Sequence, residues 1–238
     1  MNTRPFLAPM LGLAACTLAI ADEARPTTPA AAQAAAASSK LIVSGFGPFA
    51  GRPINGSYVL AKSVAEAHPA FEAVEIPVIW GAPGEARKEH KGASFWLAFG
   101  EGTSVFRIEI QADNRRGAHA DVSGRQPSEP LIVSGAPAQL RSPLPATEIA
   151  EALTSKGFPT VVSTDAGNYL CEEMLFTLLA TQKKESGDGM FVHIPVLGRT
   201  ISLPDGSQQK VTREWLAGFG KALVEELSAQ KLIPAPRS

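Results

Sequence analysis

Two residues of the sequence, Cys171 and His193, have the side chains needed for nucleophilic catalysis by a thiol. A cysteine thiolate is a nucleophile, and a neighbouring imidazole can accept the thiol proton and later donate it to a leaving group. Both residues lie between positions 159 and 197, where two β-type runs flank a helical pattern. These residue types indicate a cysteine hydrolase if the fold brings the two side chains together.

The local pattern places Cys171 near the start of a helix and His193 near the end of a strand. Apolar residues recur at helical spacing over 169–181, whereas the runs at 160–163 and 190–194 predict strands, the first of them buried. Strand ends and helix N-termini meet at one edge of an α/β sheet. The sequence therefore predicts that Cys171 and His193 lie within hydrogen-bond reach at that edge.

A purely structural role for both residues is the alternative that the same pattern supports. Free cysteine is among the most buried residue types, and leucines follow Cys171 on the same helical face. A histidine at the end of a strand is also often structural. The chemical interpretation therefore depends on the pairing of Cys171 with His193 rather than on either residue alone.

Length and composition indicate one α/β domain behind an N-terminal extension. The chain has 238 residues, of which 45% are hydrophobic, and a formal net charge of -1. It can bury one sizeable core, and its charge favours neither nucleic acid nor an acidic membrane surface as a partner. Strand and helix patterns alternate over residues 40–233, which predicts a single-domain, three-layer αβα sandwich with a mostly parallel central sheet.

The same patterns predict the individual elements that must position the site. We expect strands at residues 41–43, 72–80, 94–99 and 105–111, helices at 55–67, 84–90, 147–156 and 212–230, and an irregular segment at 117–144. The glycine-rich run after the first strand lacks the spacing of a dinucleotide-binding loop, and its Phe46 and Phe49 suggest the wall of an apolar pocket. The sequence has no metal-ligand motif, and we expect no cofactor and no metal.

The N-terminal residues suggest export from the cytoplasm. Residues 1–21 have the charge, apolar stretch and small-residue end of a signal peptide, although residues 13–16 also resemble a lipoprotein processing box ending in Cys16. Residues 22–39 predict a disordered Ala- and Pro-rich linker, and residues 234–238 a tail. We therefore expect a periplasmic or secreted protein, which contacts a membrane only if it is lipidated at Cys16.

Five short motifs follow one another over residues 40–198. They are Gly45-Phe46-x-Pro48-Phe49, Asn55-x-Ser57, Gly124-x-Gln126-Pro127, Ala166-Gly167-x-x-x-Cys171 and Phe191-x-His193-Ile194-Pro195. On this ordered set the sequence resembles the pyroglutamyl peptidase I family of cysteine peptidases. The resemblance implies a Cys–His–Glu hydrolase that removes an N-terminal pyroglutamyl residue from peptides, with Cys171 as nucleophile and His193 as base.

The resemblance also implies a set of substrate-binding residues. Phe46 and Phe49 match the aromatic pair that packs against the pyrrolidone ring, Leu170 precedes the nucleophile, and Arg115 matches the arginine of an Asp-x-Arg motif. The implied partner is a peptide or a small cyclic amide. Assembly into a homo-oligomer stays open.

One position departs from the family pattern. The glutamate of the family falls at Phe106, or at Val105 in an ungapped alignment, and the nearest carboxylates are Glu101 and Glu109. Glu109 lies three residues beyond Phe106, and an odd offset turns a strand side chain to the opposite face, so we expect it to be an exposed strand residue. Glu101, in a shortened loop at 100–102, is the better replacement.

The absence of the family glutamate leads to a prediction about activity. We expect a Cys171–His193 dyad that no carboxylate completes, because a thiolate and an imidazolium can form a pair without much assistance. Such an enzyme would be weak, since the third member of a triad normally orients the base. The alternative is a homologue without activity that binds pyroglutamate-like ligands or peptide ends.

Overall fold

The computed structural model describes residues 40–181 and 189–235 of the chain. The predicted signal peptide and linker, residues 1–39, lie outside the described residues, as do residues 182–188 and most of the predicted tail, residues 236–238. None of the helices in the described part of the chain is long and apolar enough to cross a membrane.

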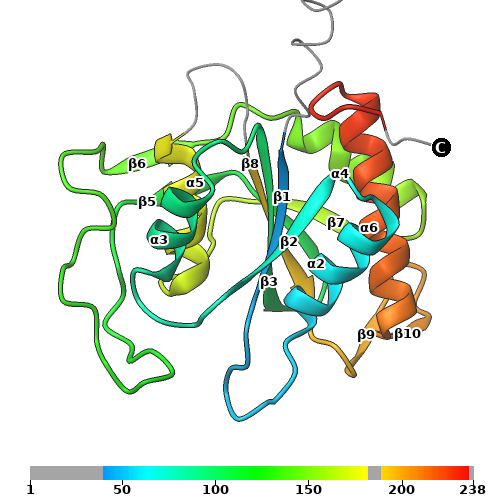
Figure 1. The fold of residues 1–238 in the computed structure, drawn as a ribbon. Coiled ribbons are helices and arrows are strands. Elements are labelled where there is room, and N and C mark those ends of the chain that lie inside the picture. Colours follow the sequence, from blue (N-terminus) through cyan, green and yellow to red (C-terminus); the bar gives the residue numbers. More distant parts are fainter. Residues whose placement is uncertain (1–39, 182–188, 236–238) are drawn as a thin grey trace, which may run out of the picture. The chain divides into compact units, whose positions relative to one another are not determined.

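Six strands form the central sheet in the order β2-β1-β3-β8-β4-β7 (Figure 1). All neighbouring strands are parallel except β4 and β8, which pair antiparallel. The strands are β1 (Leu41–Phe46), β2 (Phe71–Ile76), β3 (Phe95–Thr103), β4 (Phe106–Glu109), β7 (Thr160–Ser163) and β8 (Gly189–Pro195). Strands β1, β3 and β8 are almost wholly buried, because helices cover both faces of the sheet.

Helices cover the two faces of this sheet in separate sets (Figure 1). One set is α2 (Gly56–Ala67), α4 (Ala146–Ser155) and α6 (Arg213–Ala229), and the other is α3 (Ala82–Glu89) and α5 (Leu170–Thr181). Because strand side chains alternate, Val43 of β1 packs in the first apolar cluster and Ile42 in the second. The predicted three-layer αβα fold with a mostly parallel sheet is confirmed.

Two helices, α2 and α6, begin with a polar side chain that accepts a hydrogen bond from a backbone amide of the first turn. The side chain of Asn55 accepts a hydrogen bond from the amide of Ser57 at 3.1 Å at the start of α2, and Thr212 accepts one from Trp215 at 3.1 Å at the start of α6. Helix α4 begins at Ala146, one residue before the predicted start, and its start has no side-chain cap.

The strands differ from the prediction in three places. Strand β7 lies at an edge of the sheet and leaves Val161 46% exposed, so it is not the buried strand that its β-branched residues suggested. The strand expected at 105–111 divides into β4 and β5 (Gln111–Asp113), and β5 pairs with β6 (Gln139–Arg141) in a separate sheet. Residues 100–102 belong to β3, not to a loop.

The segment after β8 forms a small hairpin before the last helix. Strand β9 (Thr200–Ser202) pairs antiparallel with β10 (Gln208–Lys210), and the glycine at 206 provides the left-handed turn between them. This hairpin connects the end of β8, the strand that carries His193, to α6, which lies on the face of the sheet opposite α5.

Candidate active site

Cys171 is the second residue of α5 and is partly buried. Leu170 is 1% exposed and packs in the same apolar cluster as Met174 and Leu175, so it anchors the first turn of the helix. The positive end of a helix dipole stabilises negative charge within the first turn. Cys171 lies in this first turn.

Cys171 and His193 meet above a glycine of the neighbouring strand. Gly100 of β3 is the register partner of His193 in β8. A Cβ atom added to Gly100 would lie 2.8 Å from Cys171 Sγ, 3.1 Å from His193 Cδ2 and 2.7 Å from Phe191 Cζ. The structure thus brings together the two residues that the sequence identifies, in a space that exists because residue 100 has no side chain.

Glu109 completes this group. Its Oε1 lies 2.8 Å from Nδ1 of His193, and its side chain is fully buried. In the antiparallel pairing of β4 with β8, Glu109 is opposite Phe191 and Arg107 is opposite His193, so Glu109 and His193 lie on the same face of the sheet. The prediction that no carboxylate reaches His193 is therefore wrong, and so is the expectation that Glu109 is exposed.

The error has a clear physical reason. Glu109 and Phe106 do point to opposite faces, as their odd offset requires. However, Phe106 lies on the face covered by α2, α4 and α6, where its ring stacks on Phe219 at 3.6 Å. His193 and Cys171 lie on the α5 face, which is the face of Glu109. The odd offset was therefore interpreted correctly, but the position from which it was counted, Phe106, lies on the face away from His193.

Glu101, the replacement that the sequence favoured, has other partners. Its side chain is 3% exposed, forms an ion pair with Arg52 and accepts a hydrogen bond from the amide of Leu197 at 2.5 Å. It lies beside Gly56 at the start of α2, because Glu101 follows Gly100 and points to the opposite face of β3. Glu101 therefore joins two loops and does not contact His193.

The surroundings of His193 favour its protonated form. Burial by itself lowers the pKa of His193, but the charge of Cys171 and a hydrogen bond with it, together with the hydrogen bond and charge of Glu109, raise that pKa to about 10. Because Nδ1 faces Glu109, Nε2 is the ring nitrogen left for the thiol. An imidazolium held in this way stabilises a facing thiolate.

The two phenylalanines expected in the substrate pocket occupy different environments. Phe46 is 4% exposed, lies in the apolar cluster beneath α5, and donates its amide hydrogen to Ser57 Oγ at 2.9 Å. Phe49 is 43% exposed, and its ring centroid lies 5.6 Å from that of Tyr169, two residues before Cys171. Phe49 is thus the more accessible of the two, and it lies beside the residues that lead into the nucleophile helix.

Tyr169 and Trp80 also border this region, and the sequence analysis did not select them. Their rings meet edge to face at 5.1 Å, the Tyr169 hydroxyl donates to the carbonyl of Ala120 at 3.1 Å, and Trp80 Nε1 donates to the carbonyl of His119 at 2.9 Å. An aromatic residue two positions before the cysteine was the available signal for Tyr169. Trp80 had no such signal, because only the fold brings it there.

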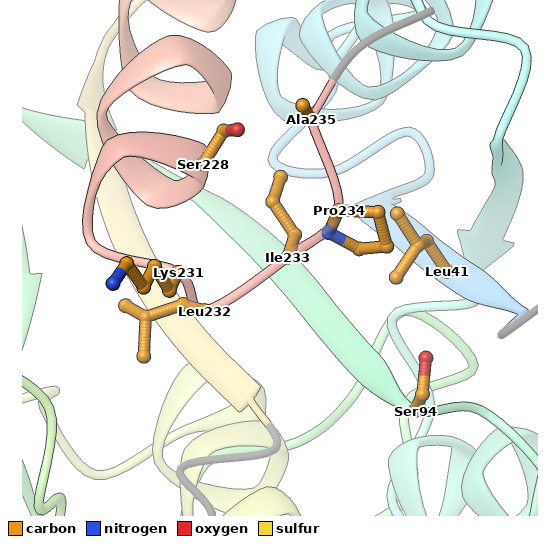
Figure 2. Close-up of a pocket in the computed structure, with 8 residues that line it drawn as sticks. All are labelled: Leu41, Ser94, Ser228, Lys231, Leu232, Ile233, Pro234 and Ala235. Atoms are coloured by element: carbon orange, nitrogen blue, oxygen red, sulfur yellow. The ribbon is translucent and has the colours of Figure 1, made fainter.

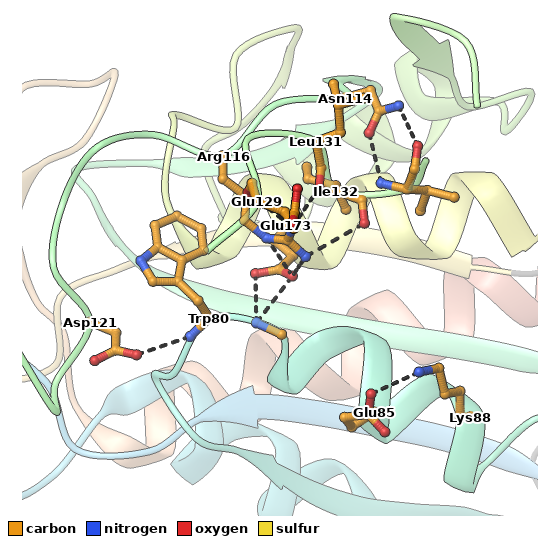
Figure 3. A network of polar contacts seen from close by, with 12 residues as sticks. Trp80, Glu85, Lys88, Asn114, Arg116, Asp121, Glu129, Leu131, Ile132 and Glu173 are labelled. Carbon is orange, nitrogen blue, oxygen red and sulfur yellow. Dashed lines mark hydrogen bonds and ion pairs between the residues drawn. The ribbon is translucent and has the colours of Figure 1, made fainter. Parts of the chain in front are cut away.

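Arg116, rather than Arg115, enters the interior near α5 (Figure 3). Its guanidinium contacts Glu173 Oε1, at 2.5 Å from Nη2 and 3.1 Å from Nε, and it also donates to the carbonyl of Leu131 at 2.5 Å. Glu173 is 1% exposed and also accepts the amide hydrogen of Gly81 at 3.2 Å. Arg115, the arginine that the sequence analysis placed at the substrate, is exposed.

A cavity of about 510 Å³ lies elsewhere in the domain (Figure 2). It is lined by Leu41, Ser94, Ser228, Lys231, Leu232, Ile233, Pro234 and Ala235. Leu41 and Ser94 lie where β1 and β3 begin, whereas His193 lies near the end of the parallel strand β8. This cavity contains none of the residues that meet at Gly100. In addition, no cluster of three or more potential metal ligands occurs within residues 40–181 and 189–235.

The sequence is similar to those of known peptidases. The chain is 30% identical to the pyrrolidone-carboxylate peptidase of Klebsiella pneumoniae (strain 342), over 72% of this chain and 85% of that protein. It is also 30% identical to the pyrrolidone-carboxylate peptidase of Streptomyces coelicolor, over 83% of this chain and 94% of that protein.

Solved structures share the fold. Pyroglutamyl peptidase I from Bacillus amyloliquefaciens superposes with a TM-score of 0.62 at 24% identity, over 78% of this chain and 94% of that chain. A mutant pyrrolidone carboxyl peptidase from Pyrococcus furiosus gives a TM-score of 0.63 at 24% identity, over 81% of this chain and 99% of that chain. Fold and sequence together define a peptidase built on an α/β domain.

The particular family follows from the sequence model that matches this chain. The model of the pyroglutamyl peptidase family matches residues 39–212, which is most of the chain. The protein therefore belongs to the pyroglutamyl peptidase family, as the ordered motifs predicted.

Proposed function

We propose that the protein is a cysteine peptidase that removes an N-terminal pyroglutamyl residue, or a related cyclic amide, from peptides. In this proposal Cys171 is the nucleophile, His193 is the general acid and base, and Glu109 orients and stabilises the imidazolium. The observation that carries it is the line of contacts from Glu109 Oε1 to His193 Nδ1 at 2.8 Å and on to the thiol above Gly100.

The first half of the reaction uses the ion pair directly. The Cys171 thiolate attacks the carbonyl carbon that links the pyroglutamyl residue to the next residue, and a tetrahedral oxyanion forms. When the C–N bond breaks, Nε2 of His193 donates its proton to the departing amine. The shortened peptide leaves with a free amino terminus, and the pyroglutamyl group stays on the sulfur as a thioester.

The second half restores the enzyme. Neutral His193 accepts a proton from a water molecule as that water attacks the thioester carbonyl. The C–S bond breaks, pyroglutamate leaves, and Cys171 is again a thiolate facing a protonated His193. No oxidant, metal or cofactor enters this scheme, because bond formation and proton transfer balance within the two residues and water.

Burial of Glu109 supports its place in the scheme. The residue is 2% exposed, and Oε2 has no hydrogen-bond partner among the described residues. A buried carboxylate with so few partners strongly favours a cation beside it, because desolvation otherwise penalises the negative charge. The imidazolium form of His193 supplies that cation, so Glu109 has the role of the family glutamate from a different position of the strand.

The proposal is tested by hydrolysis of a pyroglutamyl fluorogenic amide by the wild type and by Cys171→Ala. We expect turnover by the wild type and its complete loss in the variant, with both proteins giving the same circular dichroism spectrum. Rapid labelling of Cys171 by iodoacetamide near neutral pH would support an activated thiol. A wild type that binds a pyroglutamyl amide by calorimetry but never hydrolyses it would favour a binding protein instead.

We also propose, from residues 1–21 alone, that the enzyme acts outside the cytoplasm. Mass spectrometry of the N-terminus of the protein expressed in a bacterial host distinguishes the possibilities. A mature chain that begins at Asp22 supports a soluble exported form, a lipid-modified Cys16 supports an anchored form, and an intact Met1 contradicts export.

A further inference from the structure

A groove of about 490 Å³ lies beside the candidate active site, outside the group formed by Cys171, His193 and Glu109. Its lining comes from two segments far apart in the sequence and consists of Pro48, Phe49, Ala50, Gly51, Arg52, Pro53 and Val122. Phe49 is 43% exposed and Val122 is 52% exposed, so two large apolar side chains face solvent across this groove. Exposed apolar side chains grouped in a depression commonly mark a binding site.

One aromatic contact links the lining of the groove to the start of α5. The ring of Phe49 lies 5.6 Å from the ring of Tyr169, which stands immediately before α5 and two residues before Cys171. Phe49 therefore borders both the groove and the approach to the thiol. A peptide attached to a group that reacts at Cys171 would lead into this groove.

The first wall of the groove is held by the protein itself. The backbone bends sharply at Ala50 and Gly51, where φ is 53° and 73°, and the amide of Arg52 donates to the carbonyl of Phe49 at 3.0 Å. The guanidinium of Arg52 is paired with the buried carboxylate of Glu101 on β3. The loop that carries Phe49 is therefore tied to the strand that carries Gly100.

The second wall is anchored in a similar way. The amide of Val122 donates to the carbonyl of Val78 at 3.1 Å, and Asp121 accepts hydrogen bonds from the amides of Ser123 at 2.8 Å and Trp80 at 3.3 Å. The first wall is thus tied to β3 through a side chain and the second to the segment that follows β2, so the groove exists before a ligand arrives. A preformed site loses less conformational entropy on binding than a mobile one.

The charge of the lining decides which side chains fit. No carboxylate lines the groove, and its one charged residue, Arg52, is already paired with Glu101. We propose that this groove binds the apolar side chain of the residue that follows the pyroglutamyl group, so that the enzyme selects peptides with a large apolar residue at that position. This inference rests on the proposed function and adds the class of peptide that the site accepts.

The experiment compares three substrates that differ only in the residue after the pyroglutamyl group: leucine, alanine or glutamate. We expect kcat/KM for the leucyl substrate to exceed that for the alanyl substrate by about 10-fold, which is the usual discrimination of an apolar pocket. We expect the glutamyl substrate to be the poorest. Equal kcat/KM values for the leucyl and alanyl substrates would overturn the inference.

Two matched variants separate the groove from general effects. Val122→Ser removes an exposed apolar side chain of the groove, and Val161→Ser removes one of similar exposure, 46%, on the edge strand β7. We expect Val122→Ser to lower kcat/KM for the leucyl substrate about fivefold more than for the alanyl substrate. Val161→Ser should leave the ratio of the two unchanged. A Val122→Ser protein that loses both activities equally would contradict a role in selectivity.

The inference remains testable if the proposed function fails. If none of the three substrates is hydrolysed, calorimetry with the wild type measures the affinity for the leucyl and alanyl peptides. A Kd about 10-fold lower for the leucyl peptide, reduced in Val122→Ser, would retain the groove as a binding site without catalysis. Equal Kd values would reject the groove.

Discussion

The two faces of the central sheet are built for different purposes. The face under α2, α4 and α6 is packed with apolar side chains, including the stacked rings of Phe106 and Phe219 at 3.6 Å. The α5 side of the sheet instead carries three carboxylates that are at most 5% exposed: Glu109 on β4, and Glu172 and Glu173 on α5 itself. On the other side, the side chain of Glu101 near the end of β3 is also buried, and it is paired with Arg52. Apolar burial stabilises the fold directly, whereas a buried carboxylate costs desolvation free energy unless a partner compensates it.

Each of the three carboxylates has a partner that defines its part in the structure. Glu109 contacts His193, Glu173 pairs with Arg116, and Glu172 accepts the amide hydrogen of Asp113 at the start of the loop that covers α5. All three contacts hold elements at or around Cys171. The comparison teaches that both sides of the sheet bury apolar side chains, and that the α5 side differs because one of its buried carboxylates, Glu109, contacts His193, whereas Glu101 on the other side only joins two loops.

The largest effect should come from Glu109→Gln. An amide cannot stabilise the imidazolium form of His193 as a carboxylate does, so we expect kcat to fall by about 1,000-fold, which lies between the usual loss of a residue that only orients another group and that of a triad aspartate. Steady-state hydrolysis of a pyroglutamyl fluorogenic amide measures it. As a control, Glu101→Gln should keep kcat within about fivefold. Similar kcat values for Glu109→Gln and the wild type would show that the acid on the α5 face is not catalytic.

The second effect concerns stability on the same face. Arg116→Met leaves the carboxylate of Glu173 buried without its cation, and we expect the free energy of unfolding to fall by about 3 kcal/mol. Denaturant unfolding followed by fluorescence measures this change. Arg115→Met, at the exposed neighbouring position, should alter it by less than about 0.5 kcal/mol. Equal effects of the two variants would mean that the pair in Figure 3 does not hold the covering loop.

The third prediction tests the space above Gly100, in which Cys171 and His193 meet on the α5 side of the sheet. In Gly100→Ala the new methyl group would lie 2.8 Å from Cys171 Sγ, so the thiol or His193 must move. A displacement of about 1 Å costs about 100-fold in rate, which we expect in kcat, with unchanged secondary structure by circular dichroism. Gly102→Ala is the matched control, because a Cβ there meets nothing within 4 Å. If both alanine variants kept full activity, the contact above Gly100 would not be needed for catalysis.

The fourth prediction concerns the apolar face. Phe219→Leu removes the ring that stacks on Phe106, and we expect a loss of about 1.5 kcal/mol in the free energy of unfolding, from lost packing and aromatic contact. kcat at 25 °C should not change, because α6 contributes nothing to the α5 face. Thermal unfolding and kcat on the same preparation provide the test. A fall in kcat without a fall in Tm would contradict the separation of the two faces.

The smallest effect is a pH dependence of stability through Glu172. Burial, the largest cause, raises its pKa to about 7; the hydrogen bond from Asp113 opposes this, and the charges of Asp113, Asp165 and Glu109 add to it. Because the folded-state pKa exceeds the ordinary 4.5, the contribution of Glu172 to stability is present below pH 4.5 and is lost as pH rises through 7.

Replacement of that carboxyl group by an amide removes the titration. Relative to the wild type, Glu172→Gln should gain about 1 kcal/mol of stability between pH 5.5 and pH 8 in urea unfolding. Glu148→Gln, in the first turn of α4, provides an exposed control. A difference between wild type and Glu172→Gln that does not vary with pH would contradict the raised pKa.

The sequence by itself determined most of the helices and strands and the two residues, Cys171 and His193, that meet above Gly100. Helical periodicity over 169–181 and the apolar run at 190–194 are local signals, and each was sufficient to place Cys171 at a helix start and His193 near a strand end. The alternation of strands and helices was likewise sufficient for the αβα fold. Such signals work because the periods of 3.6 and 2 residues decide which side chains face a core.

Only the tertiary structure decided which acid meets His193 and which arginine meets α5. Glu109 and His193 are 84 positions apart, and they meet because β4 inserts antiparallel beside β8 in an otherwise parallel sheet. Strand order and direction depend on long-range pairing, which no local pattern of 105–111 encodes. The same holds for Arg116 and Glu173, 57 positions apart, since the choice between adjacent arginines depends on the path of the covering loop.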